Sequence, residues 1–255
     1  MQSNVFITRF VGHHLVKLIK VDSTSNYLKT LLSNFKPLPQ GTVIMADEQF
    51  AGRGQSNQKW LSQAGKNLTF SIFLVPHFLA VHQQFKLNQA ITLGITDCLI
   101  KLLGNNCKVK WPNDIYFNED KIGGVLIENT VRGNKISESV IGIGLNVNQT
   151  QFDTALKNAN SLANILGVDF DLMALLGDIL LAIEIRYLEL AVGNLSVLDI
   201  AFTQRLFRFK QLCQFYDGKQ IFWATIIGVS NTGLLILEND AGQQHFNLKE
   251  VELLL

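Results

Sequence analysis

The sequence predicts an α+β fold with one large and one small domain. Helical and strand-like hydrophobic periodicities occur in mixed order before Lys210, and short strands separated by turns follow it. A chain of 255 residues is also long enough to bury a substantial core. We therefore expect one domain over residues 1–208 and a second over residues 209–255.

The first domain is expected to mix helices and strands. Apolar residues at helical spacing predict helices over residues 27–33, 87–103, 171–190 and 195–207. Strands are predicted over residues 42–46, 68–75, 108–111, 122–128 and 140–147. Gly104 suits the end of the second helix, and Asp169 or Asp171 can cap the start of the third.

The C-terminal residues follow a different pattern. Short strands are predicted over residues 220–227, 234–238 and 245–248. The turns between them are Asn231-Thr232-Gly233 and Asp240-Ala241-Gly242. Strands and turns at this regular spacing indicate a small β-barrel.

The most informative segment runs from Lys110 to Gly124. It reads Lys110-Trp111-Pro112-Asn113-Asp114, with Lys121 seven residues later and then Gly123-Gly124. Pro112 biases the residue before it toward an extended conformation, and residues 118–120 predict a turn into a returning strand over 122–127. Lysine, amide and carboxylate groups gathered beside glycines can hold an anionic nucleotide next to a small acid. The alternative is a surface hairpin with solvated lysines.

A second motif is the polar loop over residues 49–60. Its glycines and exposed backbone N–H groups can form an anion-binding concavity, and Arg53 adds a planar guanidinium suited to carboxylate or phosphate. Trp60 stacks on a flat base or fills the core, and for the residue in isolation the core is the commoner place. The loop and the lysine cluster together are far more specific than a Gly-x-Gly pair alone.

Five segments, in this order, resemble the catalytic domain of biotin protein ligases. They are Asp22-Ser23-Thr24-Ser25-Asn26, the Gly52-Arg53-Gly54 loop that ends at Trp60, Lys110 to Asp114, Lys121 with Gly124, and Gly142-Ile143-Gly144-Leu145-Asn146-Val147-Asn148. Weaker similarity continues to Leu255, so nearly the whole chain is covered. The resemblance implies a class II aminoacyl-tRNA synthetase-like mixed sheet flanked by helices, followed by a small C-terminal SH3-like β-barrel.

The resemblance also implies a reaction. A biotin protein ligase condenses biotin with ATP to biotinyl-5′-AMP and transfers the biotin to a lysine of a biotin carboxyl carrier protein. The domain over residues 1–208 would then be catalytic and bind biotin and ATP. Magnesium is expected to arrive with ATP, without a separate metal site on the protein.

Residue roles follow from the matching positions. The expected catalytic residues are Lys121, which would bridge the biotin carboxylate and the α-phosphate, and Arg53. The expected biotin-binding residues are Ser23, Thr24, Ser25, Gln49, Gly52, Arg53, Lys121 and Gly124. The residues expected to bind ATP or the adenylate are Arg53, Gly54, Gln55, Trp60, Lys110, Asn113, Asp114, Asn146 and Lys249.

Some of these positions have a structural alternative. Ser23 or Thr24 could cap the helix that follows, and both roles can hold at once. Asn146 could be a turn residue at a strand end. Asp114 could orient Lys110 or a metal-bound water instead of contacting substrate.

Two stretches depart from the family pattern. Many members have basic residues and a glycine where this chain has Gln55, Ser56 and Asn57, so adenylate retention is expected to depend more on Arg53. Ser25 stands where the family has an asparagine directly after the threonine. The biotin contact from that position is therefore expected to be weaker or to use the serine hydroxyl.

Two other functions are compatible with parts of the sequence. A lipoate ligase or octanoyltransferase shares the fold and a comparable catalytic lysine, but as a class lacks the loop and Lys110–Asp114 motifs together. A non-catalytic biotin sensor would bind without turnover. The presence of both Lys121 and Arg53 disfavours the sensor.

Composition favours a cytoplasmic enzyme that binds neither DNA nor membranes. The net charge is +1 without a basic stripe, and only 21 residues precede Asp22, fewer than the roughly 50 of a DNA-binding domain. Charges within residues 172–192 indicate a buried helix rather than a membrane span. Cys98, Cys107 and Cys213 are expected to be reduced. The expected partner is the biotin carboxyl carrier domain of a carboxylase, and a homodimer is compatible with the sequence.

Overall fold

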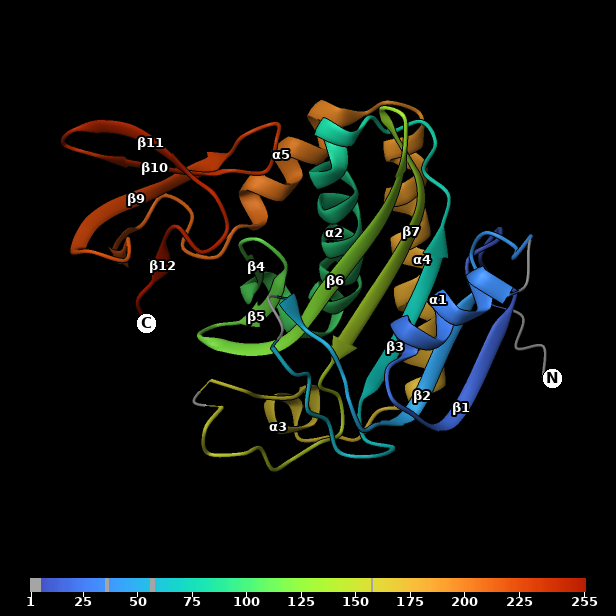
Figure 1. The fold of residues 1–255 in the computed structure, drawn as a ribbon. Coiled ribbons are helices and arrows are strands. Elements are labelled where there is room, and N and C mark those ends of the chain that lie inside the picture. Colours follow the sequence, from blue (N-terminus) through green and yellow to red (C-terminus); the bar gives the residue numbers. More distant parts are fainter. Residues whose placement is uncertain (1–5, 35–36, 56–57, 157) are drawn as a thin grey trace.

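A computed structural model describes residues 6–34, 37–55, 58–156 and 158–255. Over these residues the chain forms a seven-stranded sheet flanked by helices and a separate five-stranded sheet near the C-terminus (Figure 1).

The larger sheet is mixed, with the strand order β1-β2-β3-β7-β6-β5-β4. Its strands are β1 (Leu15–Val21), β2 (Val43–Gln49), β3 (Leu68–Leu74), β4 (Cys107–Lys110), β5 (Asp114–Phe117), β6 (Asp120–Arg132) and β7 (Lys135–Leu145). β1 and β2 are parallel, and the other neighbouring pairs of this sheet are antiparallel.

Helices cover the two faces of this sheet unequally. They are α1 (Thr24–Asn34), α2 (Gln84–Leu103), α3 (Leu162–Leu166), α4 (Leu172–Ala191) and α5 (Leu195–Arg205), with 3-10 turns η2 (Val81–Gln83) and η3 (Gly104–Asn106) beside α2. In Figure 1, α2 and α4 lie together behind the sheet, and the shorter α1 lies in front of β2 and β3.

The alternation of strand residues gives the sheet one packed face and one partly open face. On β7, Ile141, Ile143 and Leu145 belong to the main core. Gly142 and Gly144 therefore point to the opposite face, because successive residues of a strand alternate between its sides. α1 covers part of that face through a smaller apolar cluster of its own. The two glycines let other side chains pack directly against the strand on the remainder of that face.

The second sheet is antiparallel, with the order β11-β10-β9-β8-β12. Its strands are β8 (Leu212–Tyr216), β9 (Ile221–Val229), β10 (Leu235–Asn239), β11 (Gly242–Phe246) and β12 (Glu252–Leu253). The turn between β9 and β10 touches the first part of the chain. Trp111 Nε1 donates a hydrogen bond to the Gly233 carbonyl oxygen at 2.9 Å. A Cβ on Gly233 would lie only 2.6 Å from the ring of Phe85, so the contact requires glycine.

The predicted fold class is confirmed, since a mixed sheet flanked by helices precedes a small antiparallel β unit. All four predicted helices are present with shifted ends. Gly104 follows α2 with a φ of 70°. Asp171 rather than Asp169 caps α4, because its carboxylate accepts hydrogen bonds from two backbone N–H groups of the first turn.

The predicted turn at residues 118–120 and the returning strand are present, but that strand pairs with β5 and not with the predicted strand over residues 108–111. β5 lies between β4 and β6, so the segment forms two successive hairpins, and Lys110 faces Asp114 across the first of them. β5 has four residues between two turns, too few for a recognisable periodicity. β1, β8 and β12 are also absent from the sequence-based prediction.

The expectation of a buried helix over residues 172–192 is confirmed. α4 buries Leu176, Ile179 and Ile183 in the main core. Among the residues that the structure describes, no helix has the length and apolar character needed to cross a membrane.

Candidate active site

A cavity of about 540 Å³ opens on the sheet face that carries Gly142 and Gly144. Loop 49–60, the turn before β5, strands β6 and β7, and the second sheet all contribute to its walls. All expected site residues except Gly52, Lys110 and Asn146 line it. The lining residues that the prediction omits are Gln58, Lys59, Pro112, Val125, Leu126, Gly142, Ile143, Gly144, Tyr216, Gly218, Leu248, Val251 and Glu252.

One end of the cavity is formed by neutral hydrogen-bonding groups at the start of α1. Gln49 Oε1 accepts hydrogen bonds from Thr24 N at 2.8 Å and Thr24 Oγ1 at 3.1 Å. The Ser71 hydroxyl on β3 lies 2.8 Å from Thr24 Oγ1 and 3.0 Å from Ser25 Oγ. The Thr24 hydroxyl is thus engaged with Gln49 and Ser71 rather than with the helix backbone. Ser71 is a member of this network that the sequence motifs do not reveal.

Two glycines of β7 make this geometry possible. A Cβ on Gly142 would lie 2.7 Å from Ser25 Oγ, and a Cβ on Gly144 would lie 2.3 Å from Cε2 of Trp60. The indole of Trp60 therefore rests directly on the strand and forms a flat wall of the cavity. Its Nε1 is buried and has no hydrogen-bond partner among the described residues.

Loop 49–60 folds into a small hairpin over the cavity. Trp60 N donates to Gly52 O at 2.9 Å, and Gly54 N donates to Gln58 O at 2.7 Å. A Cβ on Gly52 would lie 2.4 Å from Trp60 O, so Gly52 serves the closure of the hairpin instead of lining the cavity. Gln55 does line the cavity. Ser56 and Asn57 lie outside the described residues.

Arg53 is held by groups from two other elements. Its Nη2 lies 2.7 Å from Glu128 Oε1 on β6, and its Nη1 donates to Asn26 Oδ1 on α1 at 2.8 Å. Lys29 Nζ also binds Glu128 Oε1. Burial alone would raise the pKa of Glu128, but the hydrogen bonds from Lys29 and Arg53 outweigh it and hold that pKa below its usual value. The carboxylate is therefore charged at neutral pH.

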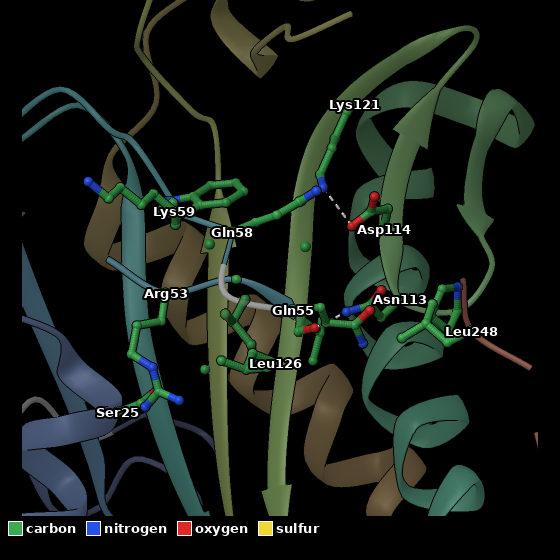
Figure 2. Close-up of a pocket in the computed structure, with 18 of the residues that line it drawn as sticks. Ser25, Arg53, Gln55, Gln58, Lys59, Asn113, Asp114, Lys121, Leu126 and Leu248 are labelled. Atoms are coloured by element: carbon green, nitrogen blue, oxygen red, sulfur yellow. Dashed lines mark hydrogen bonds and ion pairs between the residues drawn. The ribbon is translucent and has the colours of Figure 1, made fainter. Parts of the chain in front are cut away.

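Lys121 occupies a different part of the cavity. Its Nζ forms an ion pair with Asp114 Oδ1 at 2.7 Å and lies 3.8 Å from the point where a Cβ on Gly124 would be. The side chain of Asn113 donates to the Val125 carbonyl oxygen, which fixes the turn that carries Asp114. Figure 2 shows the Lys121–Asp114 pair apart from Arg53, which points toward Ser25.

Two expected ATP ligands lie outside the cavity lining. The Nζ of Lys110 lies 5.2 Å from the centre of the Tyr116 ring, a cation–π contact. Burial lowers the pKa of Lys110. Asn146 is buried, and its Nδ2 donates to the Asn160 carbonyl oxygen at 3.0 Å. This contact favours the structural alternative for Asn146.

The second sheet supplies the opposite wall of the cavity. Lys249, which the sequence indicates, lines it together with Tyr216, Leu248 and Glu252. Figure 2 shows Leu248 across the cavity from Arg53. Lys249 has a φ of 72°, a conformation that is uncommon for residues other than glycine and often marks functional sites.

Two of the three cysteines are buried, and the described residues contain no cluster of metal ligands. No group of three or more His, Cys, Asp or Glu residues there could hold a metal ion. The three cysteines are free, as expected, and burial raises the pKa of Cys98 to about 11 and that of Cys107 to about 12. These two thiols stay protonated at neutral pH and are poor nucleophiles.

The fold and the cavity define an α+β protein whose site combines lysines, hydroxyl groups and a flat indole. The model of the biotin/lipoate A/B protein ligase family matches residues 17–146, about half of the chain. The chain belongs to this family.

Known relatives resemble most of the chain. The bifunctional ligase/repressor BirA of Bacillus subtilis is 28% identical over 249 residues, which cover 96% of this chain and 76% of that protein. Biotin–protein ligase 2 of Arabidopsis thaliana is 37% identical over 156 residues, covering 60% of this chain and 46% of that protein. The structure of the biotin protein ligase from Aquifex aeolicus in complex with biotin and ATP matches with a TM-score of 0.79 at 28% identity, covering 94% of this chain and 98% of that chain.

Proposed function

We propose that the protein is a biotin protein ligase. It activates biotin with ATP to biotinyl-5′-AMP and transfers the biotin to a lysine of a biotin carboxyl carrier protein. The observation that carries this proposal is the Lys121 ammonium beside Gly124, held by Asp114 within a cavity that continues to Thr24 and Gln49. The likeness to the Aquifex aeolicus biotin protein ligase over 94% of the chain supports the same reaction.

The first step joins two anions, so the site must supply positive charge. A biotin carboxylate oxygen attacks the α-phosphorus of ATP, the bond to the β-phosphate oxygen breaks, and pyrophosphate leaves. Lys121 binds the carboxylate and the α-phosphate, and stabilises the negative charge that develops between them. Asp114, at 2.7 Å, orients the Lys121 ammonium. Magnesium would arrive with ATP and neutralise the charge of the pyrophosphate.

The remaining groups have binding roles in this proposal. Ser23, Thr24 and Gln49 bind the ureido ring of biotin at the end of the cavity where α1 begins. Trp60 provides a flat surface for the adenine, with Asn113 beside it, and Lys249 reaches the ATP phosphates. A contact between Arg53 and phosphate remains a prediction; the Arg53 guanidinium is bound to Glu128 and Asn26.

The second step consumes the adenylate. The neutral amine of the acceptor lysine attacks the acyl carbon, the bond to the phosphate oxygen breaks, and AMP leaves while the nitrogen releases one proton to solvent. The proposed acceptor is the carrier domain of a carboxylase, which must approach the open mouth of the cavity. A homodimer remains a prediction.

Lipoate ligation is the second candidate, because the family description includes lipoate enzymes. The Aquifex aeolicus structure, which matches 94% of this chain, is named a biotin protein ligase, and this favours biotin. A sensor without turnover would leave the Lys121–Asp114 pair without a role.

The deciding experiment measures ATP-dependent transfer of biotin, lipoate and octanoate to a purified biotin carboxyl carrier domain. We expect transfer of biotin alone. Lys121→Ala should lower the rate by about two to three orders of magnitude, the usual effect of removing a group that stabilises transition-state charge. Lys101→Ala, at an exposed position of α2, is the control. Transfer of lipoate, or tight biotin binding without transfer, would contradict the proposal.

A further inference from the structure

Glu128 is an acidic residue on β6 whose carboxylate is fully engaged beside the cavity. Its Oε1 binds both Arg53 Nη2 and Lys29 Nζ, and its Oε2 lies 3.4 Å from Arg53 Nη1. Asn26 binds the same Nη1 from the other side at 2.8 Å. The guanidinium is thus fixed in a plane by two acceptors that come from different elements.

This cluster contributes little to the stability of the fold. The side chains of Arg53 and Lys29 are each 39% exposed, and that of Glu128 is 25% exposed. Ion pairs with such exposure are screened by solvent, and the entropy lost in holding long side chains offsets much of the attraction. The main consequence of the cluster is therefore geometric. It sets the direction of a cation that lines the cavity.

Lys29 keeps this arrangement positive. Glu128 alone would cancel the charge of Arg53, but Lys29 shares the same oxygen, so the three charged groups in direct contact have a net charge of one positive unit. A guanidinium has five N–H donors, and its three hydrogen bonds to described residues leave further donors that a ligand could engage. Arg53 can therefore bind a ligand without leaving Glu128.

Arg53 and Lys121 act at separate places. Glu128 lies four residues beyond Gly124 on β6, which corresponds to about 13 Å along the strand, and the Lys121 ammonium lies beside Gly124. Figure 2 shows Arg53 directed toward Ser25 instead. A ligand whose carboxylate is at Lys121 would bring its far end to Arg53.

We propose that Glu128 and Asn26 are positioning residues that hold Arg53 against the ring end of biotin, while Lys29 preserves the positive charge of Arg53. This inference rests on the proposed function. It assigns Arg53 mainly to biotin affinity and leaves the chemical step to Lys121.

The test asks whether biotin affinity depends on the Glu128 carboxylate or on the net charge of the cluster. It uses Glu128→Gln and the double variant Lys29→Met/Glu128→Gln. Glu128→Gln adds one positive charge to the cluster, and the double variant restores the original net charge without restoring the carboxylate. We expect both to weaken biotin binding about tenfold, measured by calorimetry, because each loses charge-assisted hydrogen bonds to Arg53. The turnover number for biotin-dependent ATP–pyrophosphate exchange should change less than about twofold at saturating biotin.

Glu189→Gln is a matched control, because Glu189 is also a partly exposed carboxylate bound to an arginine, at 2.9 Å, but lies on α4. It should leave biotin affinity unchanged. Unchanged or tighter binding by Glu128→Gln, or normal binding by the double variant, would overturn the positioning role of Glu128. A lower turnover number with unchanged affinity would place Arg53 at the phosphate and overturn the inference. A wild-type protein that neither binds biotin nor exchanges pyrophosphate would instead refute the proposed function.

Discussion

At the scale of single residues, the site depends on glycines, because the lack of a side chain lets neighbouring groups pack against the strand. Gly144 lets the Trp60 indole lie directly on β7, since a Cβ there would lie 2.3 Å from the ring. Such a distance cannot persist, so any larger residue must displace either the ring or the strand.

We therefore expect Gly144→Ala to damage both stability and turnover. The free energy of unfolding should fall by about 1–3 kcal/mol, as is usual when a well-packed site receives an extra carbon. Turnover should fall as well, because Trp60 forms a wall of the cavity. Urea unfolding and pyrophosphate exchange would measure the two effects. In a Trp60→Leu background, Gly144→Ala should destabilise less; strictly additive effects would contradict the assigned contact.

Single residues of the site differ in whether the sequence could predict their roles. Arg53 and Lys121 stand in recognisable motifs, and both line the cavity. Glu128, Lys29 and Ser71 carry no such signal, because a charged or hydroxyl side chain on a strand or helix is ordinary until its neighbours in space are known. Asn146 stands in a motif but is bonded to the Asn160 backbone, which its position in the sequence does not reveal.

At the scale of elements, β6 links the charge cluster to the stability of the sheet. The pKa of Glu128 lies below its ordinary value of 4.5, so its charged form stabilises the folded state above that pH. This contribution is lost as the pH falls through the folded-state pKa. The exposure of the pair limits it to no more than about 1 kcal/mol.

We expect wild type to be more stable than Glu128→Gln at neutral pH. The difference in unfolding free energy should shrink as the pH falls below 4.5, because the wild-type carboxyl then becomes neutral like the amide. Urea unfolding across this range would measure it. A difference that stays constant with pH would mean that the substitution acts through packing instead of charge.

Elements also differ in how well the sequence predicts them. α2 and α4 are long and strongly periodic, so they are predicted correctly, whereas β12 has two residues and β5 four. β1 is an edge strand whose residues are mostly only partly buried, so its apolar pattern is weak. These strands form because they pair with neighbouring strands, and a local sequence pattern does not reveal that pairing.

At the scale of the whole molecule, one hydrogen bond between the two parts of the chain can be tested by mutation. The hydrogen bond from Trp111 Nε1 to Gly233 O joins the turn that precedes Asn113 to the turn between β9 and β10. Trp111→Phe keeps an aromatic ring but removes the donor, and should lower the free energy of unfolding by about 1 kcal/mol.

We expect hydrogen exchange of the β9–β10 turn to become faster in Trp111→Phe, and the KM for ATP to rise, because Lys249 is carried by the second sheet. Trp223→Phe changes an exposed tryptophan of β9 and should alter neither measurement. Unchanged exchange in Trp111→Phe would show that other contacts suffice to hold the second sheet.

The cavity has walls from both sheets, and this has a thermodynamic consequence. Any ligand that contacts Lys121 on one side and Lys249 on the other adds a reversible link between two sheets that a shared hydrophobic core already joins. Its binding free energy is shared by both units, because the separated forms cannot retain it. Unfolding of the two sheets should therefore become more tightly coupled as the nucleotide concentration rises.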